Sequence, residues 1–174
     1  IWSAKNKTVA HIVMAGCDTL QTFPSFIYLL PAIMLFKVGE LAIIFAIVPY
    51  ATVPAIRYTY LGLKRVPEVT IEAANMSGTT PFQRMWKVEL PIAIPEIMLG
   101  VNQTIMMALS MVVVASMIGV KGLGQPVLKS ITNQYFTLGL LNGLAIVVLA
   151  IVFDRISQSY AHRSQRYLQR AQHD

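Results

Sequence analysis

The chain has 174 residues, of which 55% are hydrophobic and 13% are charged, and its mean hydropathy is +0.58. Soluble domains carry roughly 25% charged residues, so this composition favours an integral membrane protein. The net charge of +6 does not indicate a nucleic-acid partner, because the basic residues lie between and beside apolar windows. The single cysteine, Cys17, excludes an internal disulfide and a thiolate metal cluster.

Four apolar stretches follow one another along the chain, at about residues 20–36, 38–58, 94–120 and 136–153. Residues 97–120 contain no Asp, Glu, Lys, Arg or His over 24 positions, and about 20 apolar residues suffice to cross a bilayer core. The sequence therefore predicts an all-α membrane protein, a polytopic helical bundle with about four transmembrane spans. The first two spans contain prolines that we interpret as kinked packing, with a pathway lined by bent helices as the alternative: Pro24, Pro31, Pro49 and Pro54.

The start of the chain lacks the pattern of a signal peptide, and its first residue is Ile1 rather than methionine. We therefore expect a mature or N-terminally truncated start, with further membrane helices upstream. Residues 1–174 are interpreted as one transmembrane domain, which includes a cytoplasmic loop at 66–92 and a basic cytoplasmic tail at 155–174. Asp154 beside Arg155 is expected to mark the end of the last helix.

The positive-inside rule gives the orientation of the predicted bundle. With the loop after the second span in the cytoplasm, only Lys37, Lys121 and Lys129 fall outside. The other 11 of the 14 basic residues then lie inside: Lys5, Lys7, Arg57, Lys64, Arg65, Arg84, Lys87, Arg155, Arg163, Arg166 and Arg170. The hairpin at 37–40 is consequently external, and so is a flexible glycine-rich turn at 119–124.

The loop at 66–92 is polar and carries its own helix signals. Residues 68–77 are expected to form a helix that ends at Gly78, a residue that readily takes the left-handed conformation. Thr80 with Gln83 predicts a capping box for a second short helix. Leu90-Pro91 is expected to stop that second helix. Apolar residues are available there for docking, or for resting against the chain's own helix ends: Phe82, Met85, Trp86 and Val88.

The third span contains polar residues that need partners in an apolar surrounding. Asn102, Gln103 and Thr104 are interpreted as interhelical hydrogen-bonding groups or as contacts with a translocation path. Ser110, farther along the same span, is interpreted as a hydroxyl that serves helix packing or as a further contact with the translocation path. No set of residues typical of catalysis stands out, since the three histidines are scattered and no HExxH, CxxC or GxSxG pattern occurs. The sequence therefore predicts neither a catalytic nor a metal site.

A spaced pattern in the loop resembles a known family. Glu72-Ala73-Ala74, then Gly78, then Leu90-Pro91 resembles the EAA motif of permease subunits of binding-protein-dependent ABC importers, of the MetI-like fold. Further segments look like the branch that imports glycine betaine and proline betaine: FIYLLP at 26–31, VNQT at 101–104, ALSMVV at 108–113 and GLGQ at 122–125. The likeness covers nearly the whole chain.

The resemblance implies a transport subunit of a bacterial or archaeal inner (plasma) membrane, without an active site of its own. It implies a permease homodimer or pseudo-dimer, two cytoplasmic ATPases and an external substrate-binding protein. ATP and Mg would be bound by the ATPase chain, so no cofactor is expected on this one. Glu72, Ala73, Ala74 and Gly78 would form the helix that enters a cleft of the ATPase, with Leu90 and Pro91 closing the motif.

Three alternatives remain at this point. The first is import of a quaternary amine such as glycine betaine, proline betaine or choline. The second is an ABC importer permease for another small solute, such as an amino acid or a sulfonate, because the loop motif does not separate these substrates. The third is a channel or a membrane-embedded enzyme, which would need intramembrane acidic, histidine or cysteine sets that the spans barely contain.

Overall fold

The fold was analysed in a computed structural model that describes residues 7–116 and 118–170, with side chains from 8 to 159 apart from 117. This part of the chain is helical and contains no strand, which confirms the predicted all-α class. The elements in chain order are α2 (Lys7–Thr22), α3 (Ser25–Phe36), α4 (Glu40–Lys64), α5 (Glu68–Met76), α6 (Pro81–Arg84), the π-helical turn η1 (Met85–Glu89), α7 (Leu90–Ser116), α8 (Gly124–Thr132) and α9 (Phe136–Arg170).

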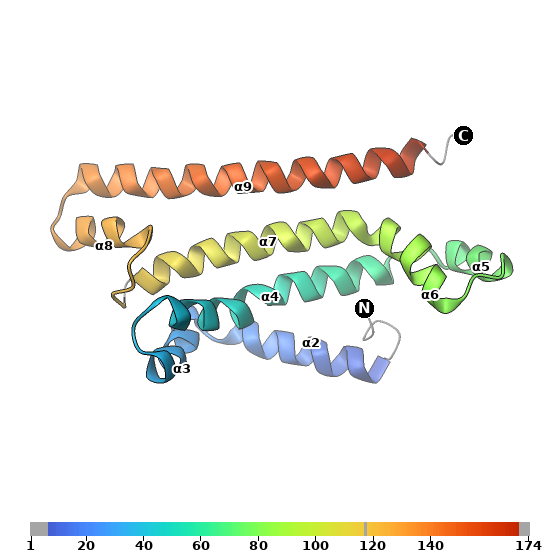
Figure 1. Cartoon of the computed structure of the whole chain (residues 1–174), viewed down its shortest axis with the longest axis horizontal. Coiled ribbons are helices and arrows are strands. Elements are labelled where there is room, and N and C mark those ends of the chain that lie inside the picture. Colours follow the sequence, from blue (N-terminus) through green and yellow to red (C-terminus); the bar gives the residue numbers. More distant parts are fainter. Residues whose placement is uncertain (1–6, 117, 171–174) are drawn as a thin grey trace.

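The long helices lie lengthwise beside one another, with short helices at both ends (Figure 1). α7 packs between α4 and α9, while α2 and α3 pack on α4. We call one end of the bundle the α5–α6 end and the other the α3–α8 end. Among the described residues, three helices are long and apolar enough to cross a membrane, and the bent pair α2–α3 makes a fourth span if counted as one. This agrees with the four spans expected from hydropathy.

Two glycines let α4 and α7 pack closely along their length. A Cβ atom on Gly100 would lie 2.7 Å from Tyr58 Cβ and 3.2 Å from the carbonyl oxygen of Pro54. A Cβ atom on Gly62 would lie 2.9 Å from Glu96 Cβ and 3.1 Å from the carbonyl oxygen of Ala93. Membrane helices gain little from hydrophobic burial against each other, so close backbone approach at small residues is what holds them.

A second cluster fills the α3–α8 end of the bundle. Its buried members come from α3, α4 and α7: Leu29, Ala32, Ala42, Ala46, Met111 and Ala115. Aromatic pairs flank it, with ring centroids 5.8 Å apart for Tyr28 and Tyr50 and 4.9 Å apart for Phe36 and Phe45. Alanines in this cluster again allow α4 to approach its neighbours closely.

The first predicted span differs from the structure. Instead of one interrupted helix at 20–36, α2 and α3 meet at a 90° bend around Pro24. Proline disfavours helical geometry at the residue before it, so the chain turns at Phe23 and restarts at Ser25. The hydroxyl of Tyr28 donates to the carbonyl of Leu20 and ties the two arms of this bend together. Pro31 lies inside α3 without ending it.

The expectation that Leu90-Pro91 stops a helix is wrong. The chain runs from α6 through η1 into α7 without a break. Proline lacks an N–H and crowds the carbonyl four residues earlier. The wider turn at η1 provides room for it, because the N–H of Leu90 bonds the carbonyl of Met85, five residues back.

Two further expectations change near the end of the chain. Asp154 does not end the last helix, since α9 continues to Arg170. The glycine-rich segment at 119–124 is a turn as expected, but Gly124 already begins α8, which hydropathy did not indicate. Hydropathy scanning misses such a helix because it is only nine residues long and carries a polar face.

The close approach at Gly100 can be tested with a matched glycine on α9. Gly100→Ala should destabilise the fold by about 1–3 kcal/mol, the usual effect of overpacking. Gly143→Ala is the control, because a Cβ at Gly143 meets no atom within 4 Å. Thermal unfolding of both variants in lipid nanodiscs measures the difference. Equal midpoints would show that the contact between α4 and α7 tolerates a side chain.

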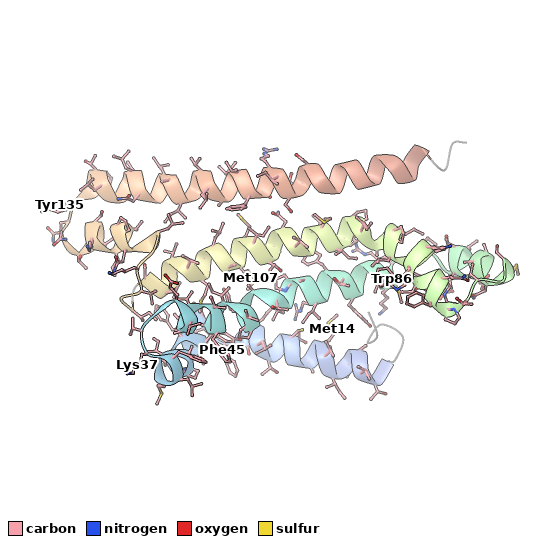
Figure 2. The ribbon with its side chains drawn as sticks, viewed as in Figure 1. Met14, Lys37, Phe45, Trp86, Met107 and Tyr135 are labelled. Atoms are coloured by element: carbon pink, nitrogen blue, oxygen red, sulfur yellow. The ribbon has the colours of Figure 1, made fainter. Side chains whose placement is uncertain are left out.

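The orientation of the bundle remains a prediction with a direct test. Figure 2 shows Lys37 and Tyr135 at one end and Trp86 at the other. We expect Met76→Cys, at a position 89% exposed at the α5–α6 end, to react with an impermeant maleimide only after cells are permeabilised. Lys37→Cys should react on intact cells. Cys17→Ala provides the background, and labelling of Met76→Cys from outside would reverse the orientation.

Candidate functional site

The segment between α5 and α6 has the bend that the sequence predicts. Gly78 has φ +72°, and two hydrogen bonds close the end of α5: Gly78 N–H to the Asn75 carbonyl at 3.0 Å and Thr79 N–H to the Ala74 carbonyl at 3.3 Å. This pair of bonds is the Schellman arrangement of a glycine-ended helix. It fixes the direction in which the chain leaves α5.

The next helix starts with the predicted capping box. The backbone N–H of Gln83 donates to Thr80 Oγ1 at 3.3 Å, and the backbone N–H of Thr80 donates to Gln83 Oε1 at 3.0 Å. Pro81 takes the first helical position, where its missing N–H costs nothing. Both helix ends of the segment are therefore satisfied without help from another molecule.

An apolar surface remains open on this segment. Val69, Met76, Phe82 and Trp86 expose 76%, 89%, 72% and 53% of their surface. The rings of Phe82 and Trp86 lie 6.0 Å apart between centroids, and Figure 2 shows Trp86 near the base of this segment. We call these four side chains, together with Glu72, the coupling surface, after the role that the sequence motif predicts for this loop. Phe82 and Trp86 lie in the first turns of the long helix that continues into α7, and Val69 and Met76 lie on α5. Large apolar side chains gathered in an exposed patch are typical of an interaction site.

The motif residues divide between this surface and the interior. Glu72 and Ala73 are exposed, whereas Ala74 is buried on the side of α5 that faces the rest of the protein. The two alanines therefore differ in surroundings: Ala73 leaves room for a partner, and Ala74 lets α5 approach α6 and η1. Leu90 and Pro91 are half-buried at the start of α7, away from the coupling surface.

The segment is anchored to the ends of α4 and α7. Leu63, Met85 and Ala93 form a buried cluster there, and Val66 is also buried. Arg65, just after α4, forms an ion pair with Glu96 of α7. The coupling surface is thus attached to the two helices that pack most closely.

One polar network here was not indicated by the sequence pattern. Arg84 Nε donates to Glu89 Oε1 at 2.7 Å, and Arg84 Nη1 donates to Asn75 Oδ1 at 2.7 Å. Glu89 is 7% exposed. From the sequence, Arg84 contributes only a positive charge to the predicted orientation. Glu89, an acidic residue at the edge of an apolar span, is the sequence signal for this network.

Within α7, Asn102 lies against α9. Its Nδ2 donates to Asp154 Oδ1 at 2.6 Å, and Gln158 Nε2 donates to both carboxylate oxygens of Asp154 at 2.9 Å. A charged group inside a membrane helix needs such partners. This contact is an interhelical hydrogen bond, which is one of the two interpretations given for Asn102. It also provides Asp154 with a partner, so that this acidic residue can lie within α9 instead of at its end.

The other candidate residues of α7 face different directions. Gln103 and Ser110 are exposed and lie on one stripe of α7 with Leu99 and Met106, at the spacing of one helix face. The hydroxyl of Ser110 donates to the Met106 carbonyl at 3.0 Å. Thr104 is half-buried, and its Oγ1 is enclosed without a hydrogen-bond partner among the described residues. Gln103 and Ser110 therefore lie on the same face of α7, whereas Asn102 lies on the face that contacts α9.

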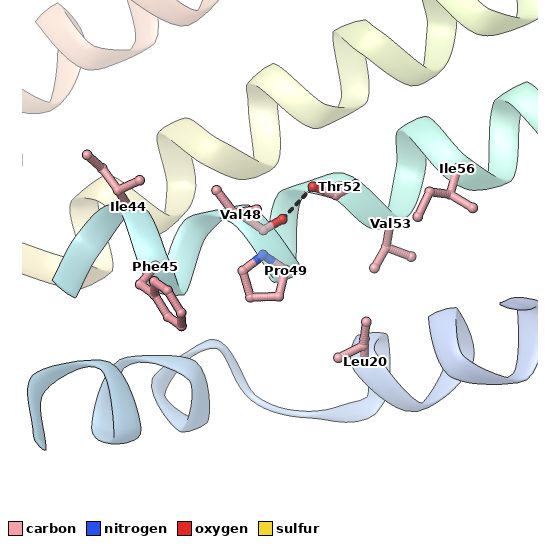
Figure 3. A pocket seen from close by; sticks show the side chains of 8 residues that line it. All are labelled: Leu20, Ile44, Phe45, Val48, Pro49, Thr52, Val53 and Ile56. Carbon is pink, nitrogen blue, oxygen red and sulfur yellow. Dashed lines mark hydrogen bonds between the residues drawn. The ribbon is translucent and has the colours of Figure 1, made fainter. Parts of the chain in front are cut away.

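The bundle also has apolar hollows. One, of about 530 Å³, lies between α2 and α4 and is lined by Leu20, Phe45, Pro49 and Val53 among others (Figure 3). Another, of about 700 Å³, lies between α8 and α9. Neither contains a charged residue. In the described part of the chain no three His, Cys, Asp or Glu residues come close enough to hold a metal ion.

Relatives of the chain include several curated transport proteins. It is 46% identical over 165 residues to the glycine betaine/proline betaine transport system permease protein ProW of Escherichia coli (strain K12), covering 95% of this chain and 47% of that protein. It is 46% identical to the glycine betaine transport system permease protein OpuAB of Bacillus subtilis (strain 168), covering 91% and 56%. Both confirm the resemblance to the betaine permease branch.

A relative with a different name is similarly close. The trimethylamine N-oxide transport system permease protein TmoV of Pelagibacter ubique (strain HTCC1062) is 42% identical, covering 97% of this chain and 24% of that protein. The chain thus spans about a quarter to somewhat over half of the length of these relatives.

Solved structures support the fold. A chain of the MetNI methionine ABC transporter in inward-facing conformations superposes with a TM-score of 0.77 at 21% identity, covering 93% of this chain and 76% of that one. This confirms the expected MetI-like helical fold. The model of the family described as "Binding-protein-dependent transport system inner membrane component" matches residues 1–166. The chain belongs to this family, and it is a multi-pass membrane protein.

Proposed function

We propose that the chain is part of the permease subunit of an ATP-driven importer for small quaternary amines, such as glycine betaine, proline betaine or choline, in a bacterial or archaeal plasma membrane. The permease would act as a homodimer or pseudo-dimer with a cytoplasmic ABC ATPase and an external substrate-binding protein. ATP and Mg would be held by the ATPase. The chain itself would bind no cofactor and perform no covalent chemistry.

The coupling surface is the observation that carries the ATP-driven part of the proposal. It combines exposed apolar side chains, an exposed carboxylate at Glu72 and a bend fixed by Gly78. This arrangement suits a groove with an apolar floor and a basic rim, and it stands at the end of the helices that would have to move.

The substrate class rests on the relatives and on the chemistry of the path. Glycine betaine and trimethylamine N-oxide, named for relatives of this chain, share a trimethylated nitrogen and a nearby anionic oxygen. Glycine betaine and trimethylamine N-oxide have no net charge, unlike choline, which is a cation, so these two need no fixed counter-ion along their route. The open stripe of α7 with Gln103 and Ser110 offers dipoles and no charge, which fits a zwitterion. An amino acid or a sulfonate is the second candidate.

Uptake by the complete transporter tests this function. A host without betaine uptake would receive the full-length permease with its ATPase and binding protein, and radiolabelled glycine betaine, trimethylamine N-oxide, choline and leucine would be compared at high osmolarity. We expect uptake of at least one methylated amine and none of leucine. Uptake of leucine alone would favour the second candidate. Betaine uptake without the ATPase would contradict the ATP-driven mechanism.

The bend at Gly78 gives a second test of coupling. A Cβ at Gly78 would meet no atom within 4 Å, so a substitution there acts through the backbone alone. Gly78→Val should disfavour the bend by about 1–2 kcal/mol or more, enough to reduce coupled transport roughly five- to thirtyfold. Gly78→Asn is the control, because asparagine tolerates positive φ. Normal transport by Gly78→Val would show that the bend is not needed.

A further inference from the structure

We propose that Arg84 is a positioning residue that joins α5, which bears the coupling surface, to the membrane helix α7. In this role its guanidinium transmits the position of α5 to η1, the turn through which α7 begins. The inference rests on the proposed coupling function and assigns the link to particular atoms. The inference concerns how a movement of α5 would reach α7, and it does not depend on which partner protein moves α5.

The contacts divide the guanidinium between two elements. Arg84 Nε faces Glu89 of η1 at 2.7 Å, and Nη1 faces Asn75 of α5 at 2.7 Å. The planar guanidinium holds its donors in a fixed fork, so the angle between the two acceptors is fixed as well. The bond to Asn75 links Arg84 to α5, and the bond to Glu89 links it to the turn that continues into α7.

The π-helical turn makes this geometry available. An α-helix rotates about 100° per residue, so side chains five positions apart point about 140° away from each other. The hydrogen bond from Leu90 N–H to the Met85 carbonyl spans five residues instead of four. A turn of that width brings residues five apart onto one face, which is the relation between Arg84 and Glu89. Straightening η1 into an α-helix would separate the pair.

The two hydrogen-bond partners of Arg84 differ in burial, so the two contacts have different roles. Glu89 is 7% exposed, and the side chain of Arg84 is 21% exposed. A buried carboxylate without its cation is strongly unfavourable, so Glu89 holds Arg84 in place. Asn75 is exposed and can change partner at small cost. The Glu89 arm is therefore structural, whereas the Asn75 arm is the one through which a displacement of α5 reaches Arg84.

The proposal predicts different effects for the two arms. Asn75→Ala should leave the amount of folded permease and its association with the ATPase unchanged. It should lower the substrate moved per ATP hydrolysed by about two- to thirtyfold, the range seen when a residue of a coupling network is changed. Arg84→Lys should do the same, because a single ammonium group cannot reproduce the fork.

The experiment uses the complete transporter in proteoliposomes, with ATP hydrolysis and glycine betaine uptake measured on the same sample. Asn133→Ala is the matched control, since it removes one exposed asparagine hydrogen bond, from Nδ2 to the Lys129 carbonyl at 2.9 Å, at the other end of the bundle. A lower ratio of uptake to hydrolysis in Asn75→Ala and Arg84→Lys, with Asn133→Ala unchanged, supports the link.

The outcomes separate this inference from the proposed function. If the unmodified transporter moves betaine with ATP and Asn75→Ala keeps the same ratio, the link through Arg84 is wrong while the function stands. If Asn75→Ala merely loses folded protein, measured by size-exclusion chromatography, Arg84 is a structural brace and the transmission role is overturned. If the unmodified transporter neither binds an ATPase nor hydrolyses ATP, the proposed function itself fails.

Discussion

The close approach of α4 and α7 is the constraint on which the other contacts depend. Gly62 and Gly100 let the two backbones meet where any side chain would collide. In a membrane, where apolar surface has no strong reason to leave lipid, such backbone contact replaces the hydrophobic core of a soluble domain. The buried cluster beneath the coupling surface, around Leu63 and Met85, lies where the ends of α4 and α7 come together.

The two ends of the bundle are built differently. At the α3–α8 end, alanines and aromatic rings pack apolar elements against one another. At the α5–α6 end, two charged pairs, Arg65 with Glu96 and Arg84 with Glu89, accompany the apolar cluster of Leu63, Met85 and Ala93. Ion pairs depend on direction and distance, whereas apolar contacts slide more easily. The ion pairs at the α5–α6 end suit the transfer of a movement from α5 to the long helices. The apolar packing at the α3–α8 end suits a point about which these helices could pivot.

The sequence predicted features that depend on neighbours in the chain. The bend at Gly78 and the capping box of Thr80 follow from residues within five positions, and both are confirmed. The contact between Asn102 and Asp154 joins residues 52 positions apart, so Asp154 looked like a helix end. The rule that proline ends a helix failed at Pro91, because a wider preceding turn removes the clash that the rule assumes.

The length of α9 has a consequence for anything that approaches the coupling surface. Its 35 residues give a rod of about 52 Å, whereas the hydrocarbon core of a bilayer is about 30 Å thick. A helix of this length that starts at one face of the hydrocarbon core and runs along the bilayer normal extends roughly 20 Å past the other face. Figure 1 shows its final turns at the same end as α6. The C-terminal turns of α9 therefore stand beside the α5–α6 segment, and they limit the directions from which a protein could dock on the coupling surface.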